Sequence, residues 1–102
     1  MSPTRLPQPR LADLPTLISQ VRQAGLPVEL HIGGQPRDLP AGIELSAFRI
    51  VQEALTNALK HADPARAQVS VRYRTDTLEL EITDGGHGLA GMRERVVLLP
   101  VR

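Results

Sequence analysis

The chain has 102 residues, enough for one domain, and its 41% hydrophobic and 23% charged residues are ordinary for a globular protein. The absence of cysteine excludes disulfides, thiolate metal sites and thiol catalysis. With a net charge of +1, one Phe, one Tyr and no Trp, the composition favours neither a polyanion-binding surface nor aromatic stacking on nucleic-acid bases.

Residues 1–10 are rich in proline and are expected to form an extended linker, with the domain spanning residues 11–102. The N-terminus lacks the apolar core of a signal peptide, and no apolar run is long enough to span a bilayer. We therefore expect a cytoplasmic domain that makes no membrane contact.

The first two elements of the domain are a helix and a strand. Apolar residues at helical spacing predict a helix from Asp13, its candidate N-cap, to Ala24, with Gly25 as the stop. Residues 28–32 then alternate between apolar and polar side chains, which predicts a half-buried strand ended by Gly33-Gly34.

A long helix is predicted from about Glu44 to Ala62, stopped by Asp63-Pro64. One face carries an apolar stripe of Phe48, Val51, Leu55, Leu59 and Ala62, and the opposite face carries Glu53, Asn57 and His61. Two oxygen ligands suit magnesium bound to a nucleotide, and Glu53 and Asn57 can supply them, with Lys60 or His61 facing the phosphates. The plain alternative is a solvated helix face.

Alternation over residues 69–74 and again over residues 78–83 predicts an antiparallel hairpin with Arg72 and Arg74 set against Glu79 and Glu81. Continuing this parity places Asp84 on the inward face, where a carboxylate needs hydrogen-bond donors. Backbone amides of the following turn could supply them, and so could a ligand such as the exocyclic amine of adenine.

The glycine-rich run Gly85-Gly86-His87-Gly88 lets a ligand approach the backbone closely. Residues 89–99 then read as a helix, with Met92, Val96 and Leu99 on one side and Arg93, Glu94 and Arg95 towards solvent. The amino end of that helix would favour phosphate.

Two stretches together resemble a known family. The run from Arg49 to Ala62, with Glu53, Asn57, Lys60 and His61, is similar to the N-box of the ATP-binding domain of bacterial sensor histidine kinases, closest to those whose partners are NarL-type response regulators. Asp84-Gly-Gly86-His-Gly88 is similar to the first glycine box of that family, and the run from Gly86 to Arg95 is similar to its second.

This resemblance implies a Bergerat-type α+β fold, a two-layer sandwich with helices on one face of a mixed, mainly antiparallel sheet. It implies ATP and Mg²⁺ as cofactors, with Glu53 and Asn57 as catalytic and metal-binding residues. The implied nucleotide-binding residues are Asn57, Lys60, His61, Asp84, Gly86, Gly88, Leu89, Gly91 and Met92.

The implied activity is that of a protein histidine kinase catalytic domain, incomplete by itself. The γ-phosphoryl of ATP would pass to a histidine on a separate dimerisation domain and then to a NarL-type response regulator, as part of a cytoplasmic or membrane-bound sensor. Nucleic acid is not an expected partner, because no basic stripe accompanies the helices. Another ATPase of the same fold, such as an anti-sigma-factor-like serine kinase, is a weaker match to residues 60–62 and 92–95.

The chain departs from the family in one respect that favours an alternative. The two glycine boxes share Gly86 and Gly88, as though the lid segment between them and the final hairpin were missing. Loss of a lid lowers affinity and rate. The alternative function is a shortened interaction module of the same fold without productive ATP binding.

Overall fold

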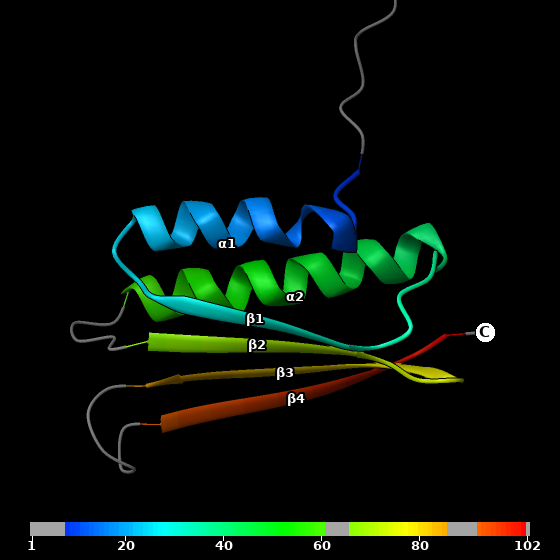
Figure 1. The fold of residues 1–102 in the computed structure, drawn as a ribbon. Helices are drawn as coiled ribbons and strands as arrows, with labels where there is room; N and C mark the ends of the chain where they lie inside the picture. The colour runs from blue at the N-terminus through cyan, green and yellow to red at the C-terminus, as the bar shows by residue number, and fades with distance from the viewer. Residues whose placement is uncertain (1–7, 61–65, 86–91, 102) are drawn as a thin grey trace, which may run out of the picture.

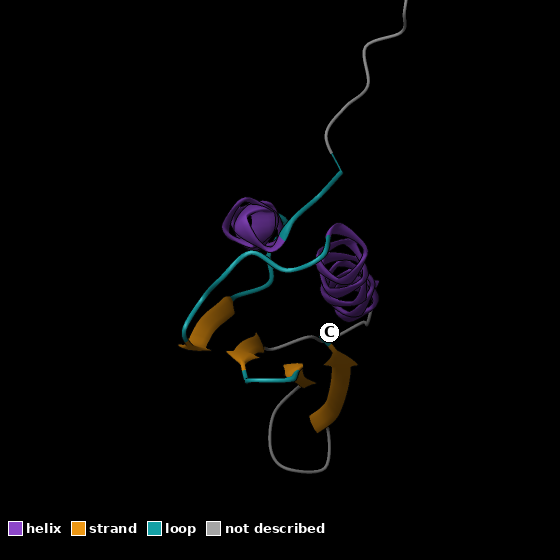
Figure 2. Cartoon of the chain, turned by 90° about the vertical axis from the view of Figure 1, so that its right-hand side faces the viewer, coloured by secondary structure: helices purple, strands orange, loops and turns teal. Residues whose placement is uncertain are grey.

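The computed structural model of the chain describes residues 8–60, 66–85 and 92–101. Within these ranges a sheet of four strands is covered on one face by two α-helices (Figure 1), and the two layers are distinct when the sheet is seen end-on (Figure 2). The strand order is β1-β2-β3-β4, with β1 parallel to β2 and the other neighbours antiparallel. The predicted α+β sandwich with a mixed, mainly antiparallel sheet is confirmed.

The first helix is confirmed with small changes at its start. A 3-10 turn, η1 (Leu11–Asp13), leads into α1 (Leu14–Gln23). Asp13 occupies the N-cap position of α1, but its carboxylate accepts a hydrogen bond of 2.9 Å from the backbone N–H of Arg10 instead of one from the helix. Gly25 has a φ of 111°, which side chains rarely tolerate, and it lies just beyond the helix end as predicted.

Strand β1 (Val28–Gly34) runs through both glycines and pairs with β2 (Arg66–Tyr73) along its whole length. Gly34 has a φ of 79°, and a Cβ atom there would lie 2.2 Å from the backbone oxygen of Tyr73. Only glycine fits this position, because any other residue would force the two strands apart.

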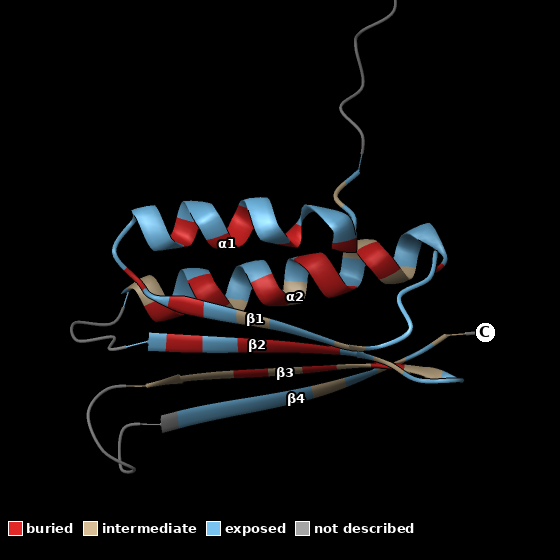
Figure 3. Cartoon of the chain, in the orientation of Figure 1, coloured by how far each residue is buried: buried red, intermediate tan, exposed pale blue. Residues whose placement is uncertain are grey.

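The long helix α2 (Ala41–Lys60) begins earlier than Glu44, because the carbonyl oxygen of Pro40 accepts hydrogen bonds of 3.0 Å from the N–H of Ile43 and 3.1 Å from that of Glu44. Its predicted apolar stripe faces the sheet (Figure 3): Phe48, Val51 and Leu55 are buried and Leu59 is half-buried. Residues 61–64, including the predicted stop, lie outside the described ranges.

Strands β2 and β3 (Thr77–Gly85) form the predicted antiparallel hairpin, with the predicted ion pairs on its outer face. Arg72 donates to Glu79 at 2.5 Å and to Glu81 at 3.4 Å, and Arg74 donates to Glu79 at 3.0 Å. Hydrogen bonds from Arg72 and then from Arg74 lower the pKa of Glu79 below its ordinary value, despite some opposing desolvation.

The helix predicted over residues 89–99 is wrong from Met92 onward. Residues Met92–Pro100 form strand β4, which pairs antiparallel with β3. An apolar run such as residues 96–99 suits either a helix or a strand, and pairing decides between them because it satisfies the open backbone edge of β3. A phosphate-favouring helix end is therefore not formed by residues 92–99, and residues 89–91 lie outside the described ranges.

Candidate functional site

The polar face of α2 lines an open pocket of about 450 Å³ near the C-terminal half of the helix. Glu53, Asn57 and Lys60 all contribute to it, and all three are exposed. The spacing of three and four residues puts them on adjacent turns of one helix face, so the predicted polar row exists. Its fourth member, His61, lies outside the described ranges.

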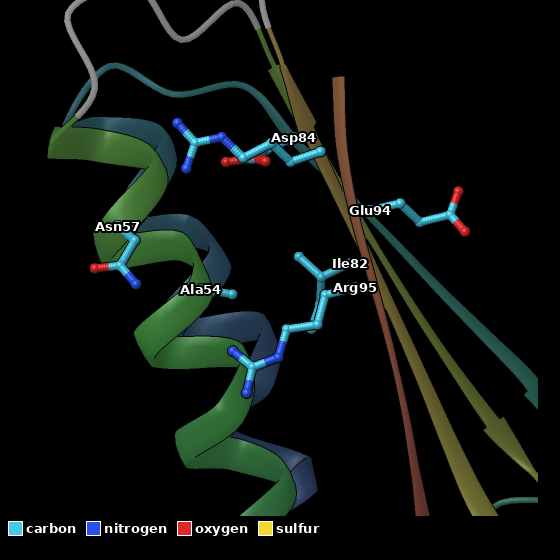
Figure 4. A pocket seen from close by; sticks show the side chains of 7 residues that line it. Ala54, Asn57, Ile82, Asp84, Glu94 and Arg95 are labelled. Atoms are coloured by element: carbon cyan, nitrogen blue, oxygen red, sulfur yellow. The ribbon is translucent and has the colours of Figure 1, made fainter. Parts of the chain in front are cut away.

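A second pocket, of about 320 Å³, lies between α2 and the strands β3 and β4. Its helix wall is Ala54 and Asn57, and its sheet wall includes Ile82 and Asp84 (Figure 4). Asp84 is half-buried and its side chain reaches from β3 toward α2, as the parity of the hairpin predicted. The structure thus brings Asn57 and Asp84 together across one pocket, although they belong to different layers.

Asn57 is shared by the two pockets, whereas Glu53 lines only the pocket on the outer side of the helix. Neither Asp84 nor Glu53 forms a hydrogen bond or ion pair with another residue that the structure describes. No cluster of three or more His, Cys, Asp or Glu side chains that could hold a metal occurs in the described part of the chain.

The sequence interpretation missed the contribution of β4. Arg93, Glu94 and Arg95 complete the pocket that contains Asp84, whereas they were expected on the solvent side of a helix. The strand register sets Arg93 opposite Asp84 and Arg95 opposite Ile82, on the side of the sheet that faces the helices. Had residues 92–99 been treated as a strand, the same parity argument that placed Asp84 would have found both arginines.

The remaining predicted site residues are not placed by the structure. Gly86, Gly88, Leu89 and Gly91 lie outside the described ranges, and only the backbone of Met92 is described. None of the described helices is both long enough and apolar enough to cross a membrane.

The fold of this chain is similar to part of a solved kinase structure. The blue-light activated histidine kinase EL346 of Erythrobacter litoralis superposes with a TM-score of 0.53 at 26% sequence identity, over 79% of this chain and 28% of that one.

The chain belongs to the family of histidine kinase-, DNA gyrase B- and HSP90-like ATPases, whose model matches residues 42–97, from α2 through most of β4. It is homologous to sensor histidine kinases. Sensor histidine kinase YxjM of Bacillus subtilis is 36% identical over 83% of this chain and 24% of its own length, and sensor histidine kinase LnrJ of the same organism is 34% identical over 72% and 20%.

The signal transduction histidine-protein kinase/phosphatase DegS of Brevibacillus brevis is 31% identical over 84% of this chain and 26% of its own length. The chain thus spans between a fifth and about a quarter of the curated relatives it matches.

Proposed function

We propose that this chain is the ATP-binding catalytic module of a sensor histidine kinase, with residues 11–102 as the domain and residues 1–10 as a linker. The observation that carries the proposal is the single pocket lined by Asn57 of α2 and Asp84 of β3. An amide oxygen and a carboxylate from two layers meet there, and each would have a partner on Mg-ATP. The module would act in the cytoplasm, where ATP is available.

Asp84 would accept a hydrogen bond from the exocyclic amine of adenine. The carboxylate reaches into the pocket beside the apolar side chains of Ala54 and Ile82, which offer contact to the flat base. Guanine carries an oxygen where adenine carries this amine, so it would bring a second acceptor against Asp84. A preference for ATP over GTP follows from that clash of acceptors.

Glu53 and Asn57 fit a magnesium ion that accompanies the nucleotide. They stand one turn apart, are exposed, and line the same pocket, and Mg²⁺ on a nucleotide takes only one or two protein oxygens. When bound, the ion would neutralise charge on the phosphates as the phosphoryl group transfers. Lys60 lines the same pocket and would face the phosphates.

The other predicted contacts complete the proposal. Gly86, Gly88 and Gly91 would let the backbone approach the nucleotide, and His61, Leu89 and Met92 would lie beside it. The γ-phosphoryl would pass to a histidine of a separate dimerisation domain, and a NarL-type response regulator would receive it from there.

The proposal is tested by calorimetric titration of the chain with Mg-ATP and Mg-GTP. Wild type should bind Mg-ATP more tightly, and Asp84→Asn should weaken ATP binding by at least about tenfold and remove the preference, because the amide no longer provides a purely accepting group. Equal binding of both nucleotides by wild type, or an unchanged preference in the variant, would contradict the adenine role of Asp84.

A second candidate is a shortened interaction module that has lost productive nucleotide binding. Strand β4 favours it, since residues 92–99, which were expected to belong to a helix with a phosphate-binding amino end, instead pair with β3. Absence of heat with either nucleotide would support this candidate and exclude the kinase module.

A further inference from the structure

Strand β4 brings positive charge into the pocket that contains Asp84. Arg95 pairs across from Ile82, which is buried on the helix-facing side of the sheet, so Arg95 lies on that same side. Figure 4 shows its side chain extending from β4 toward α2, whereas the side chain of Glu94 points the opposite way. Of these two neighbouring side chains, only that of Arg95 points toward α2.

Arg95 is exposed and makes no hydrogen bond or ion pair with another described residue. By contrast, the outer-face arginines Arg72 and Arg74 are both engaged by Glu79. A guanidinium carries five N–H donors in a planar fork that matches phosphate or carboxylate oxygens and stays charged at any physiological pH. The donors of Arg95 are therefore free for an anionic ligand.

Arg95 brings a positive charge into the pocket, whereas the carboxylate of the neighbouring Glu94 points away from α2. Apolar atoms of Ala54 and Ile82 line the same pocket and limit screening by water. The part of the pocket around Arg95 therefore favours an anion.

Asp84 and Arg95 are separated along the strands, because Arg95 pairs with Ile82, two residues before Asp84 (Figure 4). A ligand that satisfies both must be elongated, with a donor group at one end and an anionic group at the other. An adenine nucleotide has this arrangement, with its amine on the base and its phosphates beyond the ribose.

We infer that Arg95 binds a phosphate group of the nucleotide directly, and this inference rests on the proposed function. Arg95 then supplies affinity for phosphate that does not require magnesium. This affinity adds to the phosphate binding that Glu53 and Asn57 would provide through the metal ion. The predicted consequence is that AMP binds more tightly than adenosine even in a metal chelator.

The test is calorimetric titration with adenosine and with AMP in EDTA. Wild type should bind AMP about tenfold more tightly than adenosine, as expected for one partly exposed charge-assisted contact. Arg95→Gln should abolish the difference while leaving adenosine affinity unchanged, and Arg95→Lys should retain part of it because the point charge remains.

Arg66→Gln is the matched control, since it removes the same charge from an exposed arginine on the opposite face of the sheet. It should keep the tenfold difference, and thermal melting should show that all variants remain folded. If Arg95→Gln keeps the preference for AMP, the inference about Arg95 fails and the proposed function stands. If wild type binds neither adenosine nor Mg-ATP, the proposed function fails and the inference fails with it.

Discussion

Both ends of α2 carry side chains with oxygen acceptors, but the acceptors are buried at one end and exposed at the other. Near its N-terminus, the carboxylate of Glu44 is buried, with 5% of the residue exposed, and accepts hydrogen bonds of 3.0 Å from the N–H of Leu11 and 3.1 Å from that of Leu39. Toward its C-terminus, the oxygens of Glu53 and Asn57 are exposed and accept no hydrogen bond from a described residue. A carboxylate satisfied by the protein holds the fold together, and one left open can bind a ligand.

The difference lies in what surrounds each end. Around Glu44, the turn η1 and the segment before α2 converge, and their backbone N–H groups would be unsatisfied without an acceptor. Around Asn57, one pocket lies between the helix and the sheet, and a second lies along α2 beside Pro9. Burial of a polar side chain therefore identifies a structural role here, and an open polar row beside a pocket identifies the candidate site.

The largest expected effect is a loss of stability on substitution of Glu44, near the N-terminus of α2. Glu44→Ala removes the acceptor of two backbone N–H groups and should lower the free energy of unfolding by about 3 kcal/mol, as measured by urea denaturation. Glu53→Ala is the matched change near the C-terminus of α2, and it should alter the free energy of unfolding by less than about 0.5 kcal/mol. Equal losses of unfolding free energy in the two variants would contradict the structural role of Glu44 that distinguishes it from Glu53.

An intermediate effect, on ligand binding, is expected at Asn57, near the C-terminus of α2. Asn57→Ala removes a proposed metal ligand and should weaken Mg-ATP binding by about tenfold in calorimetry, with stability preserved. Gln68→Ala, which removes an exposed amide on the outer face of β2, is the control and should leave binding unchanged. If Asn57→Ala lost stability but kept its affinity for Mg-ATP, Asn57 would have a structural role and not a metal-binding one.

The smallest expected effect is the pH-dependent stability contributed by Glu79, a surface carboxylate that is paired with two arginines. Hydrogen bonds from Arg72 and Arg74 lower the pKa of Glu79 from its ordinary value of 4.5, so the charged form is favoured in the folded state. Its contribution to stability is present above pH 4.5 and is lost as the pH falls through the lowered pKa.

Denaturation of wild type and Glu79→Gln across this pH range should show a small stability difference at neutral pH that vanishes in acid. High salt should reduce the difference, because the ion pairs are at the surface. A difference that persisted in acid would show that Glu79 acts through packing and not through its charge.

Much of the site follows from periodicity. The 3.6-residue period of α2 separates Asn57 from the buried stripe, and the two-residue period of β3 sends Asp84 to the inner face, so each orientation was predictable. The buried role of Glu44 was not predictable, because its partners Leu11 and Leu39 come from other segments. Neither partner is indicated by any local pattern around Glu44.

By itself the sequence determined which face of α1, of α2 and of the β2–β3 hairpin is apolar, which charged residues pair on the outer face of that hairpin, and which family the chain resembles. Only the tertiary structure decided that residues 92–100 are a strand and that Arg95 enters the pocket. The physical reason is that four consecutive apolar residues satisfy a helix or a strand equally well, and the open edge of β3 is what selects the strand.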